Sequence, residues 1–302
     1  MRRTILLFTS GIKVLLLGGL PDEASVNVET LELTESPSSC PDFATFKTEM
    51  FGHVAAYFQG KLIVCGGLFE SACQRYDTSR RRWQKIGRMP SEREDAVSVL
   101  VSPDQWWIAG GYPSRKTSTI FDGSRFSPGP DLPYPADAAC AVLLNKTHIF
   151  LAGGRDGDNN YRSNAYLLEW ETKTWVELPP MTTARAMHGC NLAGGGQIVV
   201  VGGYNGNGYL GSSEIYSPTT NAWSRGPDLP EGIGTLHNIG SATVQLPFEN
   251  TFAIFGGEAK GQPSDIIVKY NPIEGEWVIL EERLKLARLN HVAIRVPHYF
   301  NC

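Results

Sequence analysis

This sequence of 302 residues has few charged residues, no long apolar run and no signature of a catalytic site. Charged residues make up 19 %, below the quarter that is usual in globular chains, and the net charge is −4. No run of lysine or arginine suggests a basic stripe for nucleic acid. No apolar segment approaches the ~20 residues that a membrane-spanning helix needs. These absences argue against a nucleic-acid-binding protein and against a membrane span.

Signatures of catalysis are also missing. The chain has no Gly-x-Ser-x-Gly nucleophile turn, no His-Glu-x-x-His zinc helix and no glycine-rich phosphate loop. The Ser-x-Asp-x-Gly-x-x-Trp box expected of sialidases is absent as well. The sequence therefore predicts a protein that is not an enzyme and that binds neither a cofactor nor a metal.

What the chain does have is a repeat. Glycine (32) and proline (19) are abundant, and six short apolar runs each end in a glycine pair, 43 to 54 residues apart: 18–19, 66–67, 110–111, 153–154, 202–203 and 256–257. A sustained period near 50 residues indicates a repeat architecture. Four or five consecutive apolar residues fit a strand that is buried on both faces and are too short for a helix.

Each glycine pair has similar surroundings. An apolar strand that ends in a polar turn precedes it, and a polar loop and a strand ending in an aromatic residue and a turn follow it. A fourth strand then opens with a tryptophan in four repeats: Trp83, Trp175, Trp223 and Trp277. The pattern predicts four antiparallel strands per repeat, a to d in chain order. Because one such sheet cannot bury its faces alone, the tryptophans are interpreted as packing between repeats.

This pattern resembles the kelch repeat over nearly the whole chain. The resemblance implies an all-β, six-bladed β-propeller that forms a single domain over residues 1–302. Blade 1 departs from the pattern because Thr30-Leu31-Glu32-Leu33 lacks the aromatic residue, and blade 3 has Phe126 in place of the tryptophan. The chain begins with a diglycine strand and ends with a surplus strand at 289–297, so we expect the C-terminal strand to complete blade 1 and close the ring. The propeller is expected to be a monomer.

Three histidines, His53, His188 and His291, recur near the start of the inner strands. They would suit a metal ring around the channel, but no acidic ligand falls at a matching spacing. We interpret them as polar residues that hydrogen-bond the loop below.

The b–c loops and d–a connectors should emerge on the same face, and loops carry function on a rigid scaffold. Tyrosine and arginine, which are frequent in interface hot spots, gather there. The predicted partner-binding residues are Arg93, Tyr112, Arg115, Arg155, Tyr161, Arg162, Arg185, Tyr204, Asn205, Tyr209 and Arg288. Two alternatives stay open: Arg155 and Arg162 pair only with Asp156 and Asp158, and the connector arginines are structural features of the repeat.

Six cysteines leave the cellular compartment open. Cys65 and Cys73 flank a turn and could be bridged in a secreted chain, as could Cys40 and Cys302, whereas Cys140 and Cys190 are expected as buried thiols in either case. The apolar stretch after Met1-Arg2-Arg3 is shorter than a secretion signal requires. We expect all six thiols to be reduced and the protein to be cytoplasmic, with secretion as the alternative.

The function predicted from these observations is a non-catalytic module that binds another protein on the b–c/d–a face. One rival is an extracellular, disulfide-bearing kelch protein that binds a glycan or a surface protein. The other is a propeller enzyme that acts on a sugar. The fold alone does not choose among them.

Overall fold

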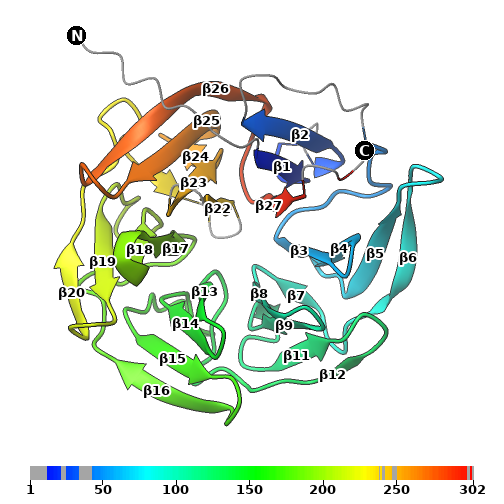
Figure 1. Ribbon diagram of the computed structural model, residues 1–302, viewed down its shortest axis with the longest axis horizontal. Coiled ribbons are helices and arrows are strands. Elements are labelled where there is room, and N and C mark those ends of the chain that lie inside the picture. The colour runs from blue at the N-terminus through cyan, green and yellow to red at the C-terminus, as the bar shows by residue number, and fades with distance from the viewer. Residues whose placement is uncertain are drawn as a thin grey trace.

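The computed structural model describes residues 12–21, 25–33, 43–237, 239, 242–246, 250–297 and 300. Six main sheets stand around a central channel like the blades of a propeller (Figure 1). The predicted all-β, six-bladed propeller is confirmed. Among the described residues, no helix is both long and apolar enough to cross a membrane.

Four antiparallel strands, in the order a to d, make up each of blades 2 to 5. Blade 2 contains β3(His53–Phe58), β4(Lys61–Gly66), β5(Ala72–Asp77) and β6(Arg82–Arg88). Blade 3 contains β8(Val97–Ser102), β9(Gln105–Ala109), β11(Ser118–Phe121) and β12(Phe126–Pro128). Blade 4 contains β13(Cys140–Asn145), β14(His148–Ala152), β15(Ala165–Glu169) and β16(Thr174–Leu178). Blade 5 contains β17(Gly189–Ala193), β18(Gln197–Val201), β19(Ser213–Ser217) and β20(Ala222–Arg225), with the short 3₁₀ turn η1(Gly194–Gly196) between its first two strands.

Blades 6 and 1 meet where the chain ends come together. Blade 6 contains β22(Thr243–Leu246), β23(Thr251–Phe255), β25(Gln262–Asn271) and the long β26(Glu276–Arg288). In blade 1, β27(Val292–Val296) pairs antiparallel with β1(Ile12–Leu17), which pairs with β2(Val28–Leu33). The predicted closure of the ring by the C-terminal strand is therefore confirmed. Three strands of blade 1 lie within the described residues, and residues 34–42, which follow β2, do not.

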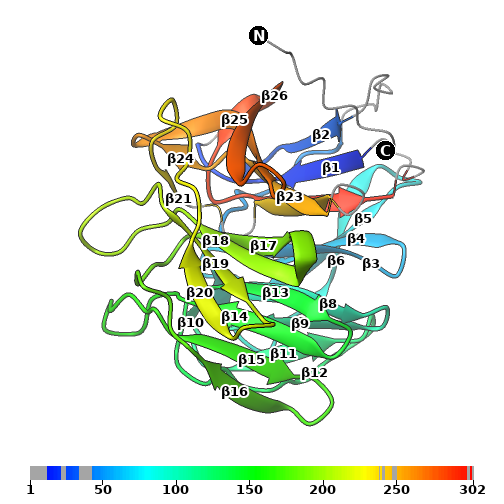
Figure 2. The same ribbon diagram turned by 60° about the vertical axis from the view of Figure 1, so that its left-hand side comes forward.

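Apolar side chains fill the spaces between neighbouring blades. The b strands are buried along nearly their whole length, as their continuous apolar runs predicted, while the outer d strands are largely exposed. Six separate apolar clusters result, one between each pair of neighbouring blades including the pair 6 and 1. The ring is thus held by blade-to-blade packing all the way round. Figure 2 shows the same sheets from an oblique angle.

The glycine pairs hold each blade to the next. In all six pairs the second glycine donates its N–H to a carbonyl of the connector that leads to the following blade, at 2.7 to 3.0 Å. The connector passes so close that a Cβ on Gly202 would lie 2.1 Å from the Leu236 carbonyl oxygen, and Gly202 also has a φ of +68°. Only glycine tolerates both the approach and the left-handed backbone.

The tryptophans pack between blades as predicted. Their indole N–H groups donate to carbonyls of the connector from the preceding blade, at 2.7 to 3.2 Å: Trp83 to Ala44, Trp175 to Asp131, Trp223 to Pro179 and Trp277 to Pro227. Blade 3 has Phe126 at this place, and phenylalanine lacks the donor.

The cysteines differ from the prediction. Cys65 and Cys73 lie opposite each other on β4 and β5 and form a disulfide. Cys140 of β13 and Cys190 of β17 form a second disulfide, with Cα atoms 6.0 Å apart, so the expectation that these two are buried thiols is wrong. The inner strands of neighbouring blades converge at the channel, which brings this pair within bridging range. Cys40 and Cys302 lie outside the described residues.

Candidate partner-binding face

The b–c loops and d–a connectors emerge together on one side of the ring, which we call the loop face. Short β-bridges tie the residue after a glycine pair to the end of a connector. They join Leu20 to Leu289, Tyr112 to Glu94, Arg155 to Asp137, Tyr204 to Ala186 and Glu258 to His237. Two of them form short strand pairs, β7(Arg93–Glu94) with β10(Tyr112–Pro113) and β21(Leu236–His237) with β24(Glu258–Ala259). The b–c loops of blades 1, 3, 4, 5 and 6 therefore have fixed bases.

Main-chain hydrogen bonds form part of a ring around the channel at the loop face, from blade 1 to blade 5. Its members have positive φ angles, and they are Asn290, Gly52, Asp95, Ala138 and Met187. From Gly52 onward each donates its N–H to the carbonyl of the member from the preceding blade, at 2.8 to 3.1 Å. The side chains beside this ring, those of Glu94 and Asp95 above all, are thereby held at the channel mouth.

The three connector arginines are buried. Arg93 is 2 % exposed, and Arg185 and Arg288 are 0 % exposed. Each guanidinium donates to the carbonyl of the first glycine of its blade: Arg93 to Gly110, Arg185 to Gly202 and Arg288 to Gly18, at 2.7 to 3.0 Å. Arg185 and Arg288 also form ion pairs with Glu214 and Glu29. They hold the bases of the b–c loops, as the alternative of structural connector arginines proposes.

The arginines of blades 3 and 4 are paired with aspartates. The buried carboxylate of Asp137 accepts hydrogen bonds from Arg115 Nε at 2.6 Å and from Arg155 Nε at 3.0 Å. Arg162 pairs with Asp156, as one alternative proposed, whereas Arg155 pairs with Asp137 instead of Asp156 or Asp158. Hydrogen bonds from Asn160 and Arg162 outweigh burial and lower the pKa of Asp156 to about 2. All three arginines remain partly accessible on the loop face.

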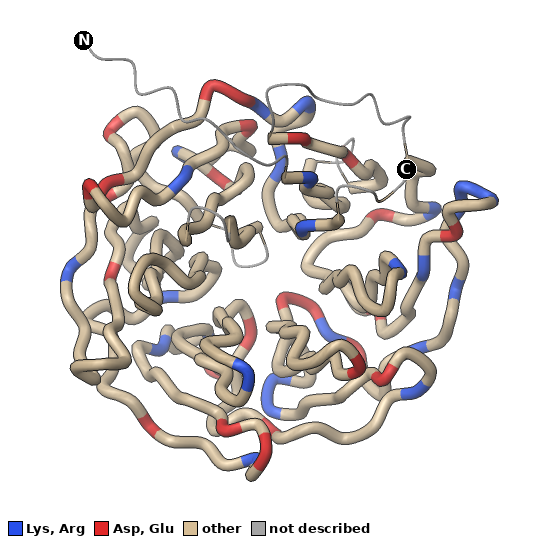
Figure 3. Tube along the Cα trace, in the orientation of Figure 1, with Lys and Arg blue, Asp and Glu red and all other residues tan. Residues whose placement is uncertain are grey.

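Two carboxylates beside Asp137 carry raised pKa values. Burial, then the charges of Glu94 and Asp137, raise the pKa of Asp95 to about 7, against the opposing effect of Arg155 and a hydrogen bond with Asn290. Burial and then Asp137 raise the pKa of Glu94 as well. In Figure 3 the trace is red where this segment reaches the channel. Negative charge is therefore crowded at the mouth of the channel on the side of blade 3.

A row of aromatic rings crosses the loop face from blade 4 to blade 6. Tyr161 meets Tyr204 at 5.4 Å between ring centroids, Tyr204 meets Tyr209 at 5.2 Å, and Tyr209 stacks on His237 at 4.1 Å. His237 in turn pairs with Glu258. Asn205 is used inside its loop, where its side-chain oxygen accepts N–H groups from Asn207 and Gly208. The structure thus brings the three predicted tyrosines into contact across two blades.

A second apolar cluster lies on blades 2 and 3. Phe69 is 63 % exposed and meets Tyr112 at 6.3 Å in an edge-on contact, with Leu68 exposed beside it. Arg115 lies over the Tyr112 ring, 4.8 Å from its centroid. Tyr112 and Arg115 of this cluster were predicted from the sequence, whereas Leu68 and Phe69 were missed. Their position directly after a glycine pair, which is where the other loop residues were found, was the available signal.

The three recurring histidines lie inside the protein. His53, His188 and His291 are 0 to 2 % exposed, and no ring nitrogen among them has a hydrogen-bond partner at standard geometry. None of these rings bonds the loop below as predicted; backbone groups of the b strands, at Ala152 and Phe255, act on His188 and His291 and raise their pKa against burial. Burial lowers the pKa of His53 and of His188 to about 3 and holds that of His291 well below its usual value. Within the described residues, no cluster of His, Cys, Asp and Glu has the arrangement of a metal site.

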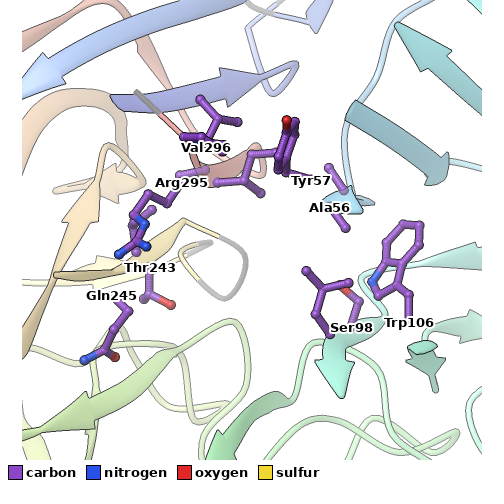
Figure 4. A pocket seen from close by; sticks show the side chains of 14 residues that line it. Ala56, Tyr57, Ser98, Trp106, Thr243, Gln245, Arg295 and Val296 are labelled. Atoms are coloured by element: carbon purple, nitrogen blue, oxygen red, sulfur yellow. The ribbon is translucent and has the colours of Figure 1, made fainter. Parts of the chain in front are cut away.

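The channel contains a cavity of about 470 Å³ at the end away from the loop face. Residues near the a–b turns line it, among them Tyr57, Trp106, Gln245 and Arg295 (Figure 4). The aromatic row and the apolar cluster of the loop face therefore lie at the opposite end of the channel from this cavity.

Several kelch-like proteins are similar to this chain in sequence, and a solved structure is similar to it in fold. The chain is 26 % identical to Kelch-like protein 41b of Danio rerio over 242 residues, which cover 74 % of this chain and 38 % of that protein. It is 25 % identical to Kelch-like protein 25 of Xenopus tropicalis, again over 74 % of this chain and 40 % of the relative. The chain thus spans about two fifths of the length of these relatives. The solved structure of YjhT superimposes with a TM-score of 0.70 over 88 % of this chain and 96 % of YjhT at 14 % identity, which speaks for the fold alone.

The family model of the KLHDC2/KLHL20/DRC7 Kelch-repeats domain matches residues 122–299, more than half of the chain. The diglycine strands, the inter-blade tryptophans and the closed ring of six sheets are in keeping with that match. The chain belongs to the KLHDC2/KLHL20/DRC7 Kelch-repeats domain family.

Proposed function

We propose that this kelch propeller is a non-catalytic module that binds another protein on its loop face. The observation that carries the proposal is where large apolar side chains are exposed. Eight are exposed among the described residues, and four of them stand on b–c loops of this one face: Leu68, Phe69, Tyr112 and Tyr209. Exposed apolar side chains that cluster on one face are typical of interaction sites.

The surroundings of these side chains support the proposal. Aromatic rings held on fixed loops lose little conformational freedom on binding, and tyrosine and arginine are favoured at the centres of interfaces. The β-bridges and the ring of main-chain hydrogen bonds fix the loop bases. The loop face therefore offers a preorganised surface of aromatic and charged groups.

Site-specific photo-crosslinking tests which face binds. The photoreactive residue p-benzoylphenylalanine replaces Tyr209 on the loop face in one variant, and Ile273, an 89 % exposed side chain on a c–d turn, in the other. Each variant is irradiated in a lysate and its adducts are identified by mass spectrometry. We expect specific protein adducts at position 209 that are absent at 273. Adducts at 273 alone would place the partner on the opposite face and refute the proposal.

Alanine substitution measures the contribution of the row. The quadruple variant of Tyr161, Arg162, Tyr204 and Tyr209 should keep the fold, because all four are loop residues, and should lose affinity for the crosslinked partner. Interface scans usually find that a minority of such residues each contribute over about 1 kcal/mol. Normal binding by the quadruple variant, together with loss of binding after changes around Asn145 on the a–b turn, would invert the assignment of the face.

The rival interpretation of a disulfide-bearing kelch protein is favoured by one observation, the bonded pairs Cys65–Cys73 and Cys140–Cys190. Disulfides of this kind persist in oxidising compartments and are rare in the cytosol. Mass spectrometry after alkylation of the unreduced native protein distinguishes bonded cysteines from free thiols. The absence of label at all four cysteines would support the disulfide-bearing protein, whereas label at all four would refute it.

A further inference from the structure

The exposed cluster on blades 2 and 3 borders Glu94, a carboxylate that forms no ion pair with any residue that the structure describes. Glu94 is the β-bridge partner of Tyr112, so its side chain stands beside the cluster formed by Leu68, Phe69 and Tyr112. A Cβ on Gly52 would lie 2.7 Å from the Glu94 Cγ, which shows that the side chain leans over the ring at the channel mouth. An apolar surface and a negative charge are therefore adjacent on the loop face.

The neighbouring cations are already engaged. Arg93 donates to the carbonyls of Gly110, Ser114 and Thr117 and is buried. Arg115 and Arg155 both donate to Asp137. Within the part of the chain that the structure describes, no ion pair or side-chain hydrogen bond reaches Glu94.

Burial and the nearby Asp137 raise the pKa of Glu94 against the opposing charge of Arg155, in agreement with a carboxylate that Arg155 compensates only in part. Placing one more anion beside Glu94 and Asp95 would add repulsion, while a cation would relieve it. The charge of this part of the loop face is thus complementary to a positive group. Charge complementarity therefore favours a partner segment that carries a cation over one that carries an anion.

We propose that the Leu68–Phe69–Tyr112 cluster docks a partner-protein segment with an apolar side chain next to a lysine or arginine, whose cation pairs with Glu94. This inference rests on the proposed function and adds the chemistry of the partner to it. The apolar side chain covers the rings of Phe69 and Tyr112 and removes them from water. The same coverage shields the ion pair at Glu94, which strengthens it.

A random 12-residue peptide library, displayed on phage and selected on the full chain, identifies the residue types that the cluster prefers in a bound segment. Peptides are counter-selected on the Phe69→Ala/Tyr112→Ala variant, with Ile273→Ala as the matched control for loss of an exposed apolar side chain. We expect clones that depend on Phe69 and Tyr112 to be enriched in lysine or arginine beside an apolar residue. Enrichment of aspartate or glutamate, or no bias in charge, would overturn the inference.

A double-mutant cycle then tests the ion pair. The best peptide and its variant with glutamine in place of the cationic residue are titrated against the wild type and Glu94→Gln. Glu94→Gln should weaken the cationic peptide about 10-fold and the glutamine peptide hardly at all. Glu171→Gln, which removes an exposed carboxylate on the opposite face, serves as the control for net charge. Equal losses for both peptides would refute the pairing.

The two proposals fail in different ways. Peptides that are lost on the quadruple variant at Tyr161, Arg162, Tyr204 and Tyr209 but show no cationic bias would leave the loop face as the binding surface and refute only the chemistry. Peptides that bind every loop-face variant as well as the wild type would refute both.

Discussion

The three buried histidines should make the propeller sensitive to mild acid. His53, His188 and His291 are neutral in the native protein because burial lowers each pKa far below 6.5. In the unfolded chain each regains its usual pKa near 6.5 and binds a proton as the pH falls. Below that pH the unfolded state holds more protons than the native state, so the free energy of unfolding decreases with decreasing pH.

The size of the effect follows from the number of protons. One proton per molecule changes stability by about 1.4 kcal/mol per pH unit, so three histidines give about 4 kcal/mol per unit below pH 6 and about 6 kcal/mol between pH 7 and 5. Domains are stable by about 5 to 15 kcal/mol in total. The effect of the histidines is therefore large enough to unfold the protein near pH 5, reduced in part by Asp95, which acts in the opposite direction.

Urea unfolding between pH 7.5 and 5 measures the slope directly. His188→Gln should lower stability at pH 7.5 but reduce the slope by about one proton, because it removes one group that titrates only when unfolded. Asn191→Ala, on β17 just after His188, is the matched control, since it should lower stability and leave the slope unchanged. Resonances of His53 and His188 that titrate in the native protein above pH 5, or a wild-type slope below one proton, would refute the reasoning.

Three further predictions concern a carboxylate, the closure of the ring and a glycine pair. The native pKa of Asp95 is about 7 and its unfolded value is 3.8, so its contribution to the free energy of unfolding falls as the pH rises from 4 to 7. Asp95→Asn should therefore be more stable than the wild type at pH 8, by about 1–2 kcal/mol after screening by water, and equal to it near pH 4. Thermal melts at both pH values can check this. Truncation after Leu284 removes β27 and exposes two sheet edges, so it should cause aggregation or a steep loss of stability; a truncated chain that melts at the full-length temperature would contradict this. Gly202→Ala should destabilise the protein by more than about 2 kcal/mol, because its Cβ would meet the Leu236 carbonyl. Gly208→Ala, whose Cβ would meet nothing within 4 Å, should be close to neutral. Equal melting temperatures of the two variants would show that the connector does not require glycine at position 202.

The sequence by itself determined the repeat architecture and the role of the residues that recur in each repeat. The apolar runs, glycine pairs and tryptophans are local patterns with direct structural causes: a strand buried on both faces, a connector that passes too close for a Cβ, and a ring between blades. Because they recur at one period, they also determined the number of blades and the closure by the C-terminal strand. The loop face could be predicted from strand alternation, and with it Tyr161, Tyr204 and Tyr209.

The tertiary structure alone decided how residues of different blades meet. Arg93 looks like a surface residue in the sequence, yet the folded connector points its guanidinium at carbonyls more than fifteen residues away. The bond between Cys140 and Cys190 depends on how closely two inner strands converge at the channel. The neighbourhood of Phe69 and Glu94 arises only when blades 2 and 3 stack. Such contacts join residues with no common local pattern, so they depend on the angle and distance between blades, which the closure of the whole ring sets.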